Sequence, residues 1–81
     1  MKTITHTNPN GETVRVSVGE HVTIGNNANV GEHATVGEYV IIGRGSTIGR
    51  DATIGDDSTV GKNVTIGWNA TIGDGSYIGL E

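Results

Sequence analysis

The hydrophobic pattern of the chain has a period of six residues. From Val18 onward, an aliphatic residue followed by glycine recurs at every sixth position without interruption. Two positions before each aliphatic residue stands a small or β-branched residue, from Val16 to Ser76. Residues two apart on a strand share a face, so each hexad predicts a short strand with this pair on its inner side. The aliphatic positions are Val18, Ile24, Val30, Val36, Ile42, Ile48, Ile54, Val60, Ile66, Ile72 and Ile78.

A turn is expected between successive hexads. Asn, Asp or Gly is the commonest residue three positions after each aliphatic residue. Glycine adopts positive φ without strain, and Asn and Asp tolerate it. We therefore expect each hexad to be one strand plus one tight corner, in which the glycine and the Asn or Asp supply the left-handed backbone.

Stacked coils of three hexads place every third hexad in one column, which buries inner rows that a single hexad leaves open. The repetition of similar residues down the first column favours this coil over other multiples of six. The residues expected to point outward are Ser17, Thr35, Thr53 and Thr71 on the first face, Thr23, Ile41, Thr59 and Tyr77 on the second face, and Asn29, Thr47 and Thr65 on the third face.

From Val16 to Gly79 the chain resembles the hexapeptide-repeat family, whose motif is aliphatic, Gly, two variable residues, a small residue and one more variable residue. The resemblance implies an all-β fold, a single-stranded left-handed parallel β-helix of about three and a half to four coils of about 18 residues. The left-handed sense is implied by the resemblance alone, because general strand-connection rules favour right-handed crossovers. The family includes bacterial acyltransferases, and some relatives bind zinc through histidines.

The first 15 residues depart from the repeat. Two stretches rich in Thr and Val flank a turn that contains Pro9 and Gly11, which predicts a hairpin or an extra strand that caps the open first coil. We therefore divide the chain into a cap at 1–15, a β-helix at 16–79 and a tail at 80–81. The tail is either part of the protein or a remnant of cloning. No comparable cap is expected at the C-terminal end, which predicts end-to-end association or fraying there.

Composition narrows the classes of function. The chain has 81 residues, no cysteine and a formal net charge of −4, so it holds one small domain without a disulfide and lacks the basic surface that nucleic acid requires. It has no signal or transmembrane segment, so a cytoplasmic location without a membrane or nucleic-acid partner is expected. A core this small favours oligomerisation.

His21 and His33 are the candidate catalytic residues, because the resemblance implies a histidine base in an acyltransferase. They lie at different corners, and His6 lies outside the repeat, so a zinc site of three histidines within one chain is not expected. The loop that interrupts the repeat near the active site of the acyltransferases is also missing here. We assign no catalytic residue and no cofactor, and an exposed corner histidine is the simpler interpretation.

Charged residues form two columns. Glu20, Glu38, Asp56 and Asp74 stack after the first face, and Arg44 and Lys62 stack after the second. The acidic column is a weak candidate for a hard cation such as Ca²⁺, because it lacks a loop that wraps the ion. In a threefold assembly, the acidic column of one chain would instead meet Arg44 and Lys62 of the next.

The second face is the expected interface, because Ile41 and Tyr77 are the only large apolar residues at outward strand positions. We interpret the chain as a non-catalytic, self-assembling structural module that forms a homotrimer and binds no cofactor. The alternative is a short acyltransferase that uses acetyl-CoA at a subunit junction. Single ranks of outward threonine argue against ice binding, and the uniform repeats leave both a natural and a designed origin open.

Overall fold

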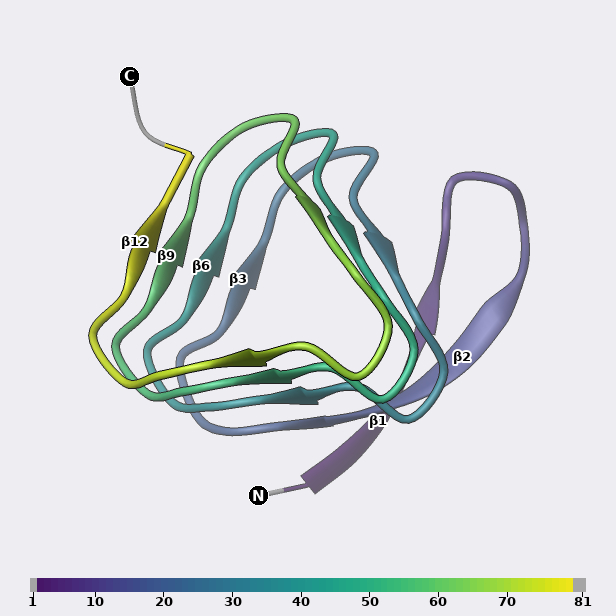
Figure 1. The fold of residues 1–81 in the computed structure, drawn as a ribbon. Helices are drawn as coiled ribbons and strands as arrows, with labels where there is room; N and C mark the ends of the chain where they lie inside the picture. Colours follow the sequence, from purple (N-terminus) through teal and green to yellow (C-terminus); the bar gives the residue numbers. More distant parts are fainter. Residues whose placement is uncertain (1, 80–81) are drawn as a thin grey trace.

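The protein is an all-β solenoid. The structure, a computed structural model, describes residues 2–79, so the expected tail of Leu80 and Glu81 lies outside the described residues. Parallel coils of about 18 residues stack into about three turns (Figure 1), which confirms the predicted fold class. The left-handed sense stays an expectation of the resemblance. Within residues 2–79 there is no helix long and apolar enough to cross a membrane.

Two long strands begin the chain and ten strands of two residues follow. The long strands are β1 (Lys2–Thr7) and β2 (Thr13–Val18). The short strands are β3 (Thr23–Ile24), β4 (Asn29–Val30), β5 (Thr35–Val36), β6 (Ile41–Ile42), β7 (Thr47–Ile48), β8 (Thr53–Ile54), β9 (Thr59–Val60), β10 (Thr65–Ile66), β11 (Thr71–Ile72) and β12 (Tyr77–Ile78).

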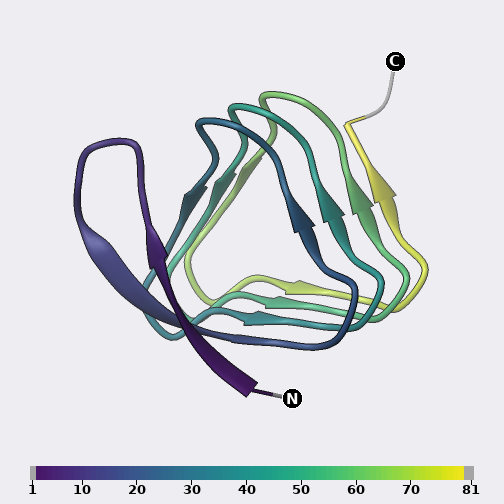
Figure 2. The same cartoon turned by 180° about the vertical axis from the view of Figure 1, so that it is seen from behind.

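The three predicted faces are three separate sheets. Their strand orders are β1-β2-β5-β8-β11 for the first face, β3-β6-β9-β12 for the second and β4-β7-β10 for the third. Each short strand pairs in parallel with the strand 18 residues away, as in Thr35 opposite Thr53 and Ile42 opposite Val60. This register confirms the coil of three hexads. Viewed roughly along the axis of the solenoid, the three sheets form the sides of a triangle (Figures 1 and 2).

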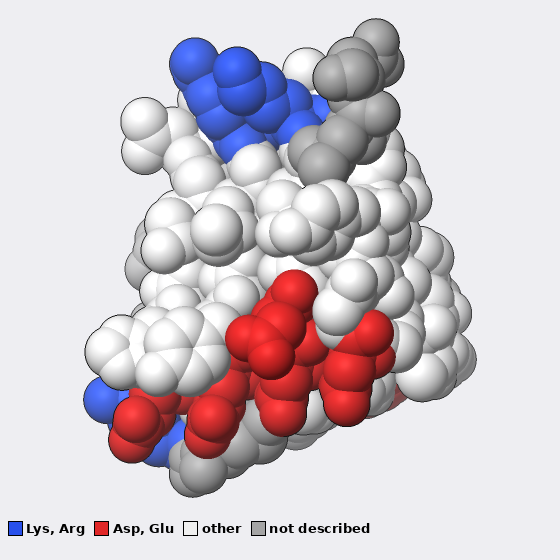
Figure 3. All heavy atoms as spheres, turned by 90° about the vertical axis from the view of Figure 1, so that its left-hand side faces the viewer, with Lys and Arg blue, Asp and Glu red and all other residues white. Residues whose placement is uncertain are grey.

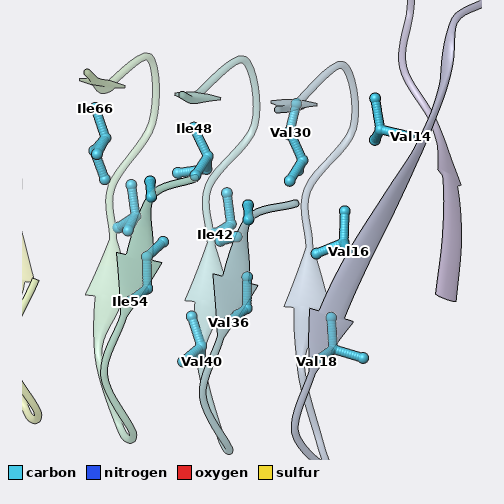
Figure 4. Close-up of a cluster of buried hydrophobic side chains, with 14 residues drawn as sticks. Val14, Val16, Val18, Val30, Val36, Val40, Ile42, Ile48, Ile54 and Ile66 are labelled. Atoms are coloured by element: carbon cyan, nitrogen blue, oxygen red, sulfur yellow. The ribbon is translucent and has the colours of Figure 1, made fainter. Parts of the chain in front are cut away.

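The interior is a narrow column of aliphatic side chains. Val36, Ile42, Ile48 and Ile54 are fully buried. Figure 4 shows residues of successive coils in rows, with Val18, Val36 and Ile54 in one row and Val30, Ile48 and Ile66 in another. Ser46 and Ser58 are buried among them, and their hydroxyls donate to the carbonyls of Gly61 and Gly73. No buried side-chain polar atom in the described part of the chain lacks a partner. The hydroxyl groups at the inner positions are therefore hydrogen-bonded where serine stands in place of alanine.

The corners use the left-handed conformation at the predicted position. Every residue three positions after an aliphatic residue has positive φ, from His21 at 62° to Gly75 at 70°. The residues at these positions include His21, His33 and Tyr39, and for the bulky Tyr39 this backbone conformation is rare. The N–H groups of His33 and Tyr39 donate to the preceding coil, to Arg15 O at 2.8 Å and to Glu20 O at 2.9 Å. The hydrogen-bond ladder therefore continues through the corners.

The glycine after each aliphatic residue has a different role from the one expected. In the inner coils these glycines do not adopt positive φ, and a methyl group on Gly43 would lie 2.6 Å from the carbonyl carbon of Gly61. At Gly25 it would lie 2.6 Å from the backbone nitrogen of Arg44. Such contacts are too short for any side chain, so the glycine is required because the next coil passes directly beneath it.

The predicted N-terminal cap is a β-hairpin. β1 pairs antiparallel with β2, from Lys2 opposite Val18 to Thr7 opposite Thr13. β2 continues into the first coil, so the strand runs across the expected division at residue 15. β1 covers the outer edge of the first face, and the hairpin extends beyond the third face (Figure 2).

Side chains of the hairpin complete the cap over β4. The amide of Asn8 donates to Val30 O at 3.0 Å and accepts from Val30 N at 2.9 Å. His6 Nε2 lies 3.5 Å from Ala28 O. Asn8 is only 8% exposed, so its amide replaces the backbone of an absent coil in a nearly dry position. The edge of β3 has no such cover among the described residues.

We expect Asn8→Ala to lower the free energy of unfolding by about 2 kcal/mol, because it leaves the N–H and C=O of Val30 without partners. Urea denaturation followed by circular dichroism measures the change. Asn10→Ala is the matched control, since Asn10 is exposed and bonds only Glu12. Equal stability of the two variants would show that Asn8 does not act as an edge cap.

Candidate functional site

The acidic column follows the corner between the first and second faces. Within it, the carboxylate of Asp56 accepts the backbone N–H of Glu38 at 2.9 Å, and the carboxylate of Asp74 accepts that of Asp56 at 2.9 Å. Each of these carboxylates therefore binds the coil before it. Hydrogen bonds to N–H groups stabilise carboxylates and offset the repulsion between like charges stacked one coil apart. The sequence placed these residues in one column but did not predict this ladder.

The next corner along the coil carries the positive charge. Arg44 and Lys62 line a shallow cavity of about 250 Å³ together with Asn27, Gly45 and Asn63. Both cationic side chains belong to exposed residues, and neither forms an ion pair within the described residues. No other described residue therefore neutralises these two cations.

The second face lies between these two corners. In Figure 3 a row of acidic side chains borders this face on one side, and lysine and arginine side chains gather on the opposite side. Ile41 is 49% exposed in the inner strand β6, and Tyr77 is 73% exposed in β12 at the end of this sheet. The structure thus brings all four predicted interface residues, Ile41, Tyr77, Arg44 and Lys62, to one face and its border.

The two candidate histidines lie at different corners and have different neighbours. His21 is exposed and stacks on Tyr39, with ring centroids 4.8 Å apart. His33 is exposed, and its Nε2 lies 4.0 Å from a carboxylate oxygen of Glu32. Glu32 also lies 3.6 Å from the guanidinium of Arg15. The structure does not bring the two histidines into one site.

A column that the sequence analysis did not single out lies at the corner after the third face. There Arg50 stacks over the ring of Trp68, with its guanidinium carbon 5.7 Å from the ring centroid. Trp68 is 71% exposed. The two residues are one coil apart, so the 18-residue period was the signal that could have identified the pair.

No described group of three or more His, Cys, Asp or Glu side chains between residues 2 and 79 is arranged to hold a metal ion. In the acidic column the two bonded carboxylates point along the stack to backbone N–H groups. A cation such as Ca²⁺ needs several oxygen ligands that converge on one point. The carboxylates of Asp56 and Asp74 therefore hold successive coils together through hydrogen bonds to backbone N–H groups, an arrangement that we call the backbone brace.

The largest cavity described lies at the N-terminal end. It encloses about 510 Å³ beside the uncovered edge of β3 and is lined in part by Lys2, Ile4, Glu20, His21 and Ile24. Its lining combines aliphatic residues with the charged residues Lys2 and Glu20. His21 is the only candidate catalytic residue that lines it.

Comparison with known proteins agrees with the repeat. A family model described as bacterial transferase hexapeptide (six repeats) matches residues 15–50 and 45–80. These overlapping ranges cover the solenoid from β2 to β12. No curated protein matches the chain.

The brace predicts opposite results for two substitutions of Asp56. We expect Asp56→Ala to lower the free energy of unfolding by about 1 kcal/mol, because the N–H of Glu38 loses its acceptor. Asp56→Asn keeps an acceptor oxygen and removes one charge from the column, so it should retain stability at least equal to that of the parent. Urea denaturation of the parent and the two variants shows whether the hydrogen bond or the charge of Asp56 determines stability. A loss in Asp56→Asn equal to that in Asp56→Ala would contradict the brace.

Proposed function

The chain belongs to the bacterial transferase hexapeptide family, and we propose that it is a non-catalytic structural module that assembles with itself into a homotrimer through the second face. The observation that carries this proposal is the character of that face. Exposed Ile41 and Tyr77 point outward from strands β6 and β12 of this face, while opposite charges border its two sides. A surface with an apolar centre and a charged rim is typical of protein interfaces.

Rotational symmetry makes the charge pattern complementary to itself. If three copies stand parallel with their second faces toward a common axis, the acidic border of each copy meets the basic border of the next. Glu38 and Arg44 belong to the same coil, so they approach at similar heights in such a ring. Opposite charges at the rim steer association and fix its orientation.

The size of the core supports self-assembly as well. The fully buried side chains are aliphatic residues of modest size together with two serines, and an 81-residue chain buries a smaller share of its surface than a larger domain does. Covering Ile41 and Tyr77 removes two large apolar side chains from water. Burial of such side chains stabilises by roughly 25 cal/mol per Å².

Acyl transfer with acetyl-CoA is a second candidate. It is favoured by the family description and by the presence of His21 in the lining of the N-terminal cavity. The second face adjoins the corner of His21 and not that of His33, so only His21 lies at a subunit junction in the proposed trimer. Thermal unfolding with and without acetyl-CoA tests this candidate. A rise in the midpoint that His21→Ala abolishes would support the enzyme and overturn the non-catalytic role.

We expect Ile41→Lys to lower the assembly mass from trimer to monomer, because the trimer would bury an additional charge on each chain. Sedimentation equilibrium measures the mass. Thr53→Lys is the matched control, since Thr53 is an exposed outward residue in a strand of the first face. Survival of the trimer in Ile41→Lys, or its loss in the control, would remove the second face from the assembly.

A charge exchange tests the rim separately. Glu38→Lys and Arg44→Glu should each weaken the trimer, because like charges then meet at the rim. High salt should weaken the parent trimer, because it screens the attraction between opposite charges. The variant with both changes should regain the trimer, since its borders are opposite again. Light scattering at two salt concentrations gives the masses, and a double variant as weak as the single ones would argue against rim pairing.

A further inference from the structure

The turn of the N-terminal hairpin contains Asn10 followed by Gly11, the only Asn-Gly pair in the sequence. In such a pair the backbone nitrogen of glycine can attack the side-chain amide carbon of asparagine, because glycine carries no Cβ that obstructs the approach. Both residues are exposed, and a methyl group on Gly11 would meet nothing within 4 Å. The surroundings therefore leave space for this reaction, and the hydrogen bonds of the turn decide whether it occurs.

The backbone of the turn keeps the two reacting groups apart. Gly11 N donates to Asn8 O and Asn8 N donates to Glu12 O, both at 2.8 Å. Pro9 precedes Asn10, which lacks positive φ, and these features fit a type I turn. In that turn the position of Asn10 has ψ near about 0°, which eclipses the next nitrogen with the residue's own nitrogen. Ring closure needs the next nitrogen eclipsed with Cβ, so the closed turn does not react.

The side chain of Asn10 is held in the closed turn as well. Its Oδ1 accepts the N–H of Glu12 at 3.0 Å, and its Nδ2 donates to Glu12 Oε1 at 3.3 Å. In the attack, Nδ2 is the group that must leave as ammonia. Its bond to the carboxylate of Glu12 is therefore broken before the product forms, which adds to the protection of the amide.

The same turn is connected to the cap over β4. Asn8, whose backbone closes the turn, also binds the N–H and C=O of Val30 through its side-chain amide. Asn8 is the buried residue of the loop, whereas Pro9, Asn10 and Gly11 are exposed. Release of the Asn8 amide from Val30 frees the segment that closes the turn. Opening of the cap therefore loosens the turn around Asn10.

We propose that Asn10 is a modification site that is protected while the cap is closed and is deamidated when the cap opens. In the open turn, the Gly11 nitrogen loses its proton and bonds to Cγ of Asn10. The bond from Cγ to Nδ2 breaks, and ammonia leaves with that proton. Water then opens the resulting succinimide ring at either carbonyl, which gives aspartate or isoaspartate. Water is the only other reactant, and no electron is transferred.

Neither product can restore the closed turn. Each one replaces the Nδ2 donor with a carboxylate beside Glu12, so a hydrogen bond is lost and like charges repel. Isoaspartate also adds one carbon to the main chain of the loop, which displaces Gly11 N from Asn8 O. Deamidation thus acts as a one-way release of the cap and leaves the edge of β4 uncovered. No residue of the second face takes part, so this release is independent of the proposed trimer.

Peptide mapping by mass spectrometry measures the rate at Asn10 in the full chain during incubation at mildly alkaline pH. The rate should follow the population of the open form. We expect Asn8→Ala to raise it about thirtyfold, the change in population that corresponds to the loss of stability expected above for this variant. Asp56→Ala is the matched control, because it removes a hydrogen bond at a distant corner and should leave the rate unchanged.

Two outcomes of this measurement would overturn the proposal. Equal acceleration by Asn8→Ala and Asp56→Ala would show that global unfolding exposes Asn10, without a separate opening of the cap. A rate in the native parent equal to that of the same chain in urea would show that the closed turn gives no protection.

Amide hydrogen exchange of the deamidated protein, separated by its added negative charge, tests the one-way release. The N–H of Val30 donates to Asn8 Oδ1 at 2.9 Å, and it should exchange at least about tenfold faster after deamidation. The N–H of Gly43, which donates to Val60 O at 2.7 Å, should not change. Asn10→Gln incubated in the same way should keep Val30 protected, since its side chain must close a larger ring. Unchanged exchange at Val30 in the deamidated protein would overturn the release.

Discussion

The structure depends on the close approach of successive coils at the corners. A coil can pass directly beneath the one before it only where the corner carries no Cβ, as at Gly25 and Gly43. The residue two positions later then turns the chain with positive φ. These two requirements fix the length of each side, and equal sides bring the chain back over itself after three hexads. Strand pairing, the aliphatic column and the ladder of corner hydrogen bonds all follow from this stacking.

Exact repetition turns a property of one residue into a property of a whole column. Residues 18 positions apart lie above one another, so like residues form stripes along the molecule. In the acidic column, stacking would be unfavourable without the carboxylate bonds to Glu38 N and Asp56 N. At another corner, the same stacking produces the contact of Arg50 with Trp68. The charged borders of the second face are thus a consequence of the fold as well as of composition.

A solenoid has two ends, and its stability depends on how each is closed. This chain uses a hairpin and the amide of Asn8 at one end, while the described residues leave the strand edges of the other end open. The histidines lie apart, and each is engaged with a local neighbour.

The sequence by itself determined the strands, the coil length and the membership of each column, because these depend on a period of six and on inward and outward alternation. It also identified the corner residues with positive φ, since Asn27 and Asp51 have side chains suited to that conformation. The tertiary structure alone decided what occupies the space between coils. The steric role of the glycines, the carboxylate brace and the bonds from Asn8 to Val30 across 22 residues arise from neighbours that are distant in sequence. A periodic pattern specifies which residues stack, but only the packed coils specify which of their atoms meet.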